Sequence, residues 1–180
     1  HHPRPALGNC GALSMIRDRR AQSAVWGFLG MLVFIAIASG LVDIYRLYAA
    51  RNWAYSVAQE AAMTAASRGR DWSSLMVDGN VRLDPDISNA QAQAVIDSAM
   101  SSRGVATYVK DVRVLPDPGG GSVAGYPPRP VRLASGAGTW NSTEPAVGVY
   151  LEVPVNWLML DMLNLNEKTV RVFAAAGVAH

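Results

Sequence analysis

Side chains that commonly carry out catalysis are scarce in this chain of 180 residues. The three histidines are His1, His2 and His180, and the one cysteine is Cys10. A Ser-His-Asp arrangement would depend on His180, which we do not expect to be held rigidly at a chain terminus. Because these residues and spacings do not assemble into a catalytic constellation, we predict neither an enzyme nor a bound cofactor.

Ligands for metals and phosphates are equally sparse. The glycines at residues 119–121 lack the Lys-Ser/Thr pair that a phosphate-binding P-loop needs. Asp84, Asp86 and Asn89 have the oxygen ligands that calcium prefers, but the other ligands of an EF-hand loop are missing, and cap or turn roles explain the same residues. No Lys/Arg cluster alternates with aromatic residues, so we expect no nucleic acid as partner. The lack of a catalytic constellation leads us to expect no small-molecule substrate either.

The stretch that limits the function most is a charge-free apolar segment at residues 21–42. As a helix it would span about 33 Å, enough to cross a hydrocarbon core of about 30 Å. Two other interpretations stay open. A core helix of a soluble domain should show a polar stripe, and a cleaved signal sequence should end in small residues, as Ala36-Ile37-Ala38 does. The length of the segment favours a retained transmembrane helix over residues 21–43.

The residues around this segment predict its orientation. Arg17, Arg19 and Arg20 lie on its N-terminal side, and the positive-inside rule places that side in the cytoplasm. Trp26 fits an aromatic anchor at the inner interface. We therefore expect a basic cytoplasmic leader at residues 1–20, a single pass through the cell (inner) membrane, and an extracytoplasmic C-terminal part.

Two apolar patterns are candidates for contacts with other proteins. Ala36 and Gly40 form a small-xxx-small pair, which lets a second helix approach closely within a membrane. Such pairs also arise by chance in apolar helices, so ordinary helix surface is the alternative interpretation. The second candidate is an apolar docking segment made of Trp157, Leu158, Met159 and Leu160.

Helical periodicity continues beyond the apolar segment through residues 44–68. Apolar residues recur there at three- and four-residue steps, alanine is frequent and proline is absent. Arg68 followed by Gly69 predicts the end of the helix, with the glycine in the left-handed conformation. We expect one helix of roughly 70 Å over residues 21–68, whose outer half packs an alanine-rich face against a sheet or another helix.

The remaining residues, 69–180, predict a small α+β domain, because strand-like segments accompany one further helix. The strand-like segments, rich in β-branched residues, are 105–115, 147–155 and 168–178. Pro154 either ends the second strand or displaces it to a sheet edge. Proline and glycine dominate residues 116–145, which predicts a long irregular loop.

Two local motifs predict further elements of this domain. Asp78-Gly79 is a favoured two-residue turn between apolar runs, which predicts a small hairpin over residues 75–83. Ser88 and Gln91 resemble a capping box that opens a helix, and Gly104 is expected to close that helix.

Residues 19–68 resemble a known family. The sequence RAQSAV at residues 20–25 is similar to the start of TadE-like minor pseudopilins of the tight-adherence (Tad/Flp) pilus system. Asp43-Ile44-Tyr45-Arg46 resembles the acidic-x-x-Arg closure of the apolar segment in that family, and residues 51–66 resemble its alanine-rich helix. One position departs from the pattern: Trp26 stands where the family has a glutamate.

The resemblance implies a single-pass, pseudopilin-type protein that acts through protein contacts in a pilus-assembly or secretion apparatus. In prepilins the glutamate is associated with assembly, where its charge neutralises a neighbouring N-terminal amine, and Trp26 cannot do this. The departure favours a relative that stays in the membrane. The alternative is an accessory single-pass structural subunit of a large membrane complex, such as an energy-transducing one. In both cases the expected partners are the membrane and other membrane proteins.

Overall fold

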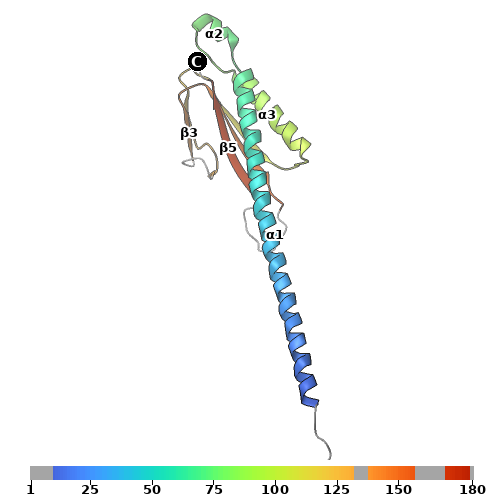
Figure 1. Ribbon diagram of the computed structural model, residues 1–180. Coiled ribbons are helices and arrows are strands. Elements are labelled where there is room, and N and C mark those ends of the chain that lie inside the picture. The colour runs from blue at the N-terminus through green and yellow to red at the C-terminus, as the bar shows by residue number, and fades with distance from the viewer. Residues whose placement is uncertain (1–9, 132–137, 157–168, 179–180) are drawn as a thin grey trace, which may run out of the picture.

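A computed structural model describes residues 10–131, 138–156 and 169–178, with side chains from residue 22 onward. Figure 1 shows one long helix, whose C-terminal half is built into a small α+β domain and whose N-terminal half extends away from it. This helix, α1, runs unbroken over Cys10–Arg68. The predicted continuous helix is confirmed, and it begins well before residue 21.

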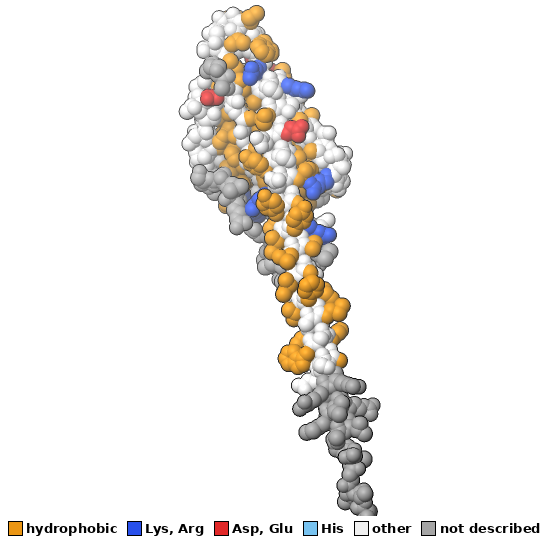
Figure 2. All heavy atoms as spheres, in the orientation of Figure 1, with side chains coloured by type: hydrophobic (Ala, Val, Ile, Leu, Met, Phe, Trp, Pro, Cys, Tyr) orange, Lys and Arg blue, Asp and Glu red, His pale blue; other side chains and the backbone are white. Residues whose placement is uncertain are grey.

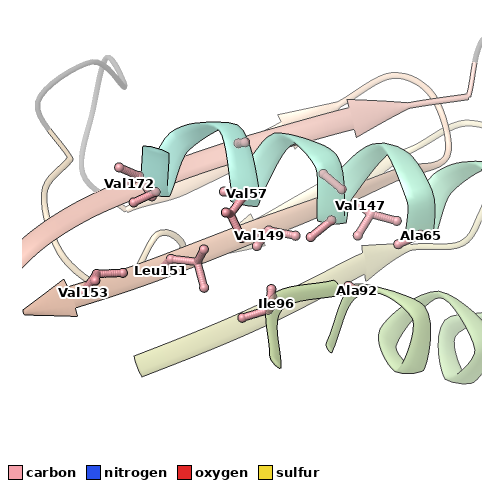
Figure 3. Close-up of a cluster of buried hydrophobic side chains, with 14 of the residues drawn as sticks. Val57, Ala65, Ala92, Ile96, Val147, Val149, Leu151, Val153 and Val172 are labelled. Carbon is pink, nitrogen blue, oxygen red and sulfur yellow. The ribbon is translucent and has the colours of Figure 1, made fainter. Parts of the chain in front are cut away.

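The C-terminal half of α1 is packed through small side chains. Its fully buried alanines are Ala54, Ala58, Ala61, Ala62 and Ala65. Because alanine adds only a methyl group, the helix axis can approach both a sheet and a second helix closely. Figure 3 shows Val57 of α1, Val149 of the central strand and Ile96 of the second long helix meeting in this core. The predicted alanine-rich packing face is therefore confirmed, with a sheet and a helix as its neighbours.

A three-stranded antiparallel sheet, in the order β1-β4-β5, forms the centre of the domain. Its strands are β1 (Val109–Leu115), β4 (Ala146–Pro154) and β5 (Thr169–Gly177). Val149 in the central strand pairs with Val112 on one side and Ala174 on the other. All three predicted strands are confirmed. Pro154 ends the central strand instead of displacing it to an edge, because a residue without an N–H interrupts the ladder least at its end.

The second long helix, α3 (Pro85–Ser102), packs beside α1 and against β1. It begins after Asp84, whose carboxylate accepts hydrogen bonds from two backbone N–H groups of the first turn, at 2.9 and 3.1 Å. The predicted capping box at Ser88 and Gln91 is therefore wrong, since both residues lie inside the helix and Ser88 is fully buried. The predicted closure is confirmed, with Gly104 at a φ of +68°.

The predicted hairpin over residues 75–83 is also wrong, because this region contains a short helix, α2 (Trp72–Asp78). Asp71 caps α2 by accepting hydrogen bonds from the hydroxyl and the backbone N–H of Ser73, and these bonds lower the pKa of Asp71. Gly79 ends α2 at a φ of +69°. An Asp-Gly pair fits a hairpin turn and a helix end alike, since both place glycine at positive φ.

The predicted irregular loop at residues 116–145 contains a second, two-stranded sheet. Its strands are β2 (Gly121–Ala124) and β3 (Thr139–Ser142). Tyr126, Trp140 and Phe173 of β5 form an aromatic cluster with ring centroids 5.5–6.1 Å apart. Such tilted and edge-to-face contacts hold the small sheet against the face of the main sheet opposite α1. The domain thus has three layers, which are the helices, the central sheet and the small sheet of β2 and β3.

Candidate interaction surfaces

The N-terminal half of α1 is a bare apolar surface, which we call the stem and define as residues 22–42. Among the described residues, one helix, Gln22–Arg68, is long and apolar enough to cross a membrane, and its most apolar window is 0% buried. Figure 2 shows the stem covered by apolar side chains, with basic side chains first appearing where it joins the domain. The stem is therefore not a core helix of this domain, and it is consistent with a single-pass membrane anchor.

The predicted contact residues of the stem lie on one side of the helix. Ala36 and Gly40 are one turn apart. Apart from the backbone of α1 itself, no atom of the described residues lies within 4 Å of the position that a Cβ on Gly40 would take. Trp26 is 66% exposed and lies within about 40° of Gly40 around the axis, roughly 21 Å further toward the N-terminus. The structure therefore leaves this face open to a partner.

Two sets of predicted residues cannot be compared with the structure. The first set is the three arginines that precede the stem, whose side chains lie outside the described part of the structure: Arg17, Arg19 and Arg20. The predicted docking segment lies outside the described residues altogether, and it consists of Trp157, Leu158, Met159 and Leu160. The roles of both sets stay predictions.

The candidate calcium ligands have structural roles. Asp84 caps α3, and the Asn89 side-chain oxygen accepts a hydrogen bond of 2.9 Å from the Gln93 amide. Across residues 22–131, 138–156 and 169–178, whose side chains the structure describes, no group of three or more His, Cys, Asp or Glu side chains comes together. The interpretation of Asp84 as a cap residue is confirmed.

A buried polar cluster lies on the face of β4 that is turned toward β2 and β3, and the sequence analysis did not predict it. Glu152 is 7% exposed, accepts a hydrogen bond from the Tyr150 hydroxyl, and pairs with Arg129 at 3.4 Å and Arg171 at 3.8 Å. Burial raises the pKa of Tyr150, and the hydrogen bond to Glu152 raises it further. Tyr150 therefore stays a neutral donor at physiological pH, and the cluster joins β4, β5 and the residue 125–131 segment. The one feature of the sequence that could have indicated this cluster is Glu152, a glutamate inside an otherwise apolar strand.

A second buried tyrosine, Tyr126, donates its hydroxyl proton to backbone carbonyl groups. The Tyr126 hydroxyl lies 2.8 Å from the carbonyl oxygen of Asp111 and 2.9 Å from that of Gly148, so its proton is shared between two acceptors on β1 and β4. Burial raises the pKa of Tyr126. Gly148 leaves room for this arrangement, because a Cβ there would lie 3.0 Å from ring atoms of Tyr126 and Trp140. Both tyrosines thus hold the layers together and are not poised as bases.

Comparisons with protein-family models, with curated proteins and with solved structures find no match. The class of the protein is therefore defined by its architecture, which is a small three-layer α+β domain carried on one long helix with an exposed apolar stem.

Proposed function

We propose that this chain is a single-pass, membrane-anchored, TadE-like pseudopilin-type protein that acts by protein contacts in a pilus-assembly or secretion apparatus. The observation that carries the proposal is the unbroken helix α1, which is exposed and apolar in its first half and packed by alanine into a domain in its second. One rigid element then joins the membrane to the domain. A helix of this kind transmits position and load between partners in the membrane and partners outside it.

The orientation in this proposal rests on charge. Arg17, Arg19 and Arg20 precede the stem, and a charge-free stretch follows them up to Asp43. The positive-inside rule then places the N-terminal side in the cytoplasm and the domain outside the cell (inner) membrane. Asp43 itself is fully buried, so the first carboxylate after the stem is covered by the fold.

One residue favours a second candidate function. Trp26 is an exposed aromatic residue at the position where the resembling family has its glutamate. Without that charge the chain is suited to remain in the membrane, as an accessory structural subunit of a larger complex. N-terminal sequencing separates the two functions, because a new N-terminus at Gln22 indicates prepilin-type processing and a chain intact through Arg20 contradicts it.

The proposal is tested by purifying the full chain from native membranes in a mild detergent and identifying what accompanies it. We expect the inner-membrane platform and the ATPase of a pilus or secretion apparatus. Recovery of a stoichiometric energy-transducing complex instead would favour the alternative. Purification without any membrane partner would contradict both functions.

The Ala36/Gly40 face allows the same experiment to be controlled. Gly40→Leu should lower partner recovery about tenfold, or ~1.4 kcal/mol, because the larger side chain keeps a second helix at a distance. Gly27→Leu is the matched control, since Gly27 is equally open and lies about 140° from Gly40 around the axis. Equal recovery with both variants would show that this face makes no contact.

A further inference from the structure

A cleft of about 630 Å³ opens on the stem side of the domain, where α1 leaves it. Its walls come from three separate parts of the chain, which are residues 45–53 of α1, the turn at residues 103–107 after α3, and the end of β4 at residues 153–156. The volume is in the range of pockets that hold small organic groups. The packing and anchoring roles described above do not explain why this cleft is present.

The cleft is positively charged. Arg46 and Arg103 line it, and no acidic residue is among its lining residues. In the described part of the chain, neither arginine forms an ion pair with a carboxylate. Two unpaired guanidinium groups around one hollow attract an anion, and their forked N–H donors match the oxygens of a phosphate.

One of the two arginines is held in place by an aromatic ring. The guanidinium carbon of Arg103 lies 4.2 Å from the ring centroid of Trp53. A guanidinium stacked on a ring face keeps its N–H groups directed outward in its own plane, where they can donate to a ligand. Trp53 therefore orients a cation without neutralising it, and the stacked side chain loses less entropy when an anion binds.

The position of the cleft relative to the stem indicates the source of the anion. Arg46 lies four residues beyond Val42, which is about 6 Å along the helix, and each headgroup layer of a bilayer is roughly 5–8 Å thick. Tyr45, beside it, is 72% exposed and has the amphipathic ring that is enriched at membrane interfaces. If the stem spans the bilayer, the lower end of the cleft lies among lipid headgroups.

We propose that this cleft binds the phosphate headgroup of an anionic glycerophospholipid, such as phosphatidylglycerol, from the leaflet on the side of the domain. The proposal rests on the membrane anchoring that is proposed above. A zwitterionic headgroup is disfavoured, because its ammonium group would enter the same hollow as two guanidinium groups. A bound lipid would fix the height and tilt of the domain above the membrane.

The test uses the purified full chain in a neutral detergent and counts bound lipids by native mass spectrometry. We expect one phosphatidylglycerol to bind about tenfold more tightly than phosphatidylcholine with the same acyl chains. The variant Arg46→Gln/Arg103→Gln should abolish this preference. Arg46→Gln alone should weaken it, and because Arg46 is exposed this variant tests the site without disturbing the fold.

The matched control is Arg70→Gln/Arg82→Gln, which removes the same charge beside α2 and should leave the preference unchanged. Equal binding of the two lipids, or an unchanged preference in Arg46→Gln/Arg103→Gln, would overturn the proposal. Displacement of phosphatidylglycerol by an equal concentration of inorganic phosphate would also overturn it, because the ligand would then be a free anion.

Failure of this proposal is distinguishable from failure of the membrane anchor. Extraction of native membranes with alkaline carbonate reports on the anchor alone, since an integral protein stays in the pellet. A chain that stays in the pellet but shows no lipid preference retains the anchor and rejects the lipid site.

Discussion

Gly69 ends α1 at a place that has no room for a side chain. A Cβ there would lie 1.8 Å from the Ser88 hydroxyl oxygen and 2.7 Å from the carbonyl oxygen of Ala65. The Gly69 N–H donates to that same carbonyl at 2.9 Å, and its own carbonyl accepts from the N–H of Asp84 at 2.7 Å. The glycine is needed for close approach between α1 and α3. The predicted left-handed conformation is wrong, since Gly69 is not among the residues at positive φ.

We therefore predict that Gly69→Ala lowers the free energy of unfolding by about 2–3 kcal/mol, because the backbone oxygen of Ala65 cannot move aside as a side chain can. Chemical denaturation of the detergent-solubilised chain, followed by circular dichroism, measures this loss. Gly119→Ala is the matched control, since Gly119 has open space around it and no positive φ. A loss no greater than that of the control would contradict the close packing of Gly69.

At the scale of the elements, Asp97 connects α3 to β1. Its carboxylate accepts hydrogen bonds from the Tyr108 hydroxyl, at 2.6 Å, and from the Lys110 ammonium group. The bond to Lys110 lowers the pKa of Asp97, and the bond to Tyr108 adds to this. A carboxyl whose pKa is lower in the folded chain stabilises the fold at pH values above its unfolded pKa, near 3.8. This stabilisation is lost as the pH falls through the folded pKa.

Asp97→Asn should therefore destabilise the domain by about 0.5 kcal/mol at pH 7, the size typical of an exposed ion pair. The difference from the unmodified chain should shrink as the pH falls below about 3.8 and disappear once the pH is below the lowered folded pKa, where the carboxyl is protonated in both states. Thermal melts across this pH range measure it, and Asp117→Asn, in an exposed turn, serves as the control. A difference that persists at acid pH would show that the charge of Asp97 is not responsible.

The elements differ in how far sequence reasoning could predict them. The long helix and the three strands of the main sheet were predictable, because their periodicity extends over many residues and no competing signal interrupts it. The helix α2 was not predictable from Asp78-Gly79, since the choice between hairpin and helix depends on the Asp71 cap. The strands β2 and β3 are four residues each and depend on the contact of Trp140 with Phe173 of β5, which is distant in sequence.

The candidate surfaces divide in the same way. The apolar stem was predictable because it is continuous in the sequence, and the helix contact at Ala36 and Gly40 stays a prediction. The cleft around Arg46 and Arg103 was not, because it joins α1 to a turn and a strand end that only tertiary packing brings together. Long-range assembly also explains the buried Glu152 cluster, in which an apolar-looking strand carries a carboxylate that meets its arginines only after folding.

At the scale of the whole molecule, α1 determines how far apart the two ends of the protein lie. At about 1.5 Å per residue, its 59 residues span roughly 88 Å. Cys10, at the start of α1, is the one cysteine of the sequence, and Met76, in α2 at the far end of the domain, is 88% exposed. If the stem spans the inner membrane with its N-terminal side inside, these two positions lie on opposite sides of that membrane.

This arrangement predicts opposite reactivity toward a membrane-impermeant maleimide in intact spheroplasts. A Cys10→Ser/Met76→Cys variant should be labelled at once, whereas the unmodified chain should be labelled at Cys10 only after detergent opens the membrane. The reverse pattern would show that the domain faces the cytoplasm. Labelling of both chains without detergent would show that no membrane separates the two ends. A chain shortened to a point within the stem would show that the apolar segment is a cleaved signal, since Cys10 would then be lost with it.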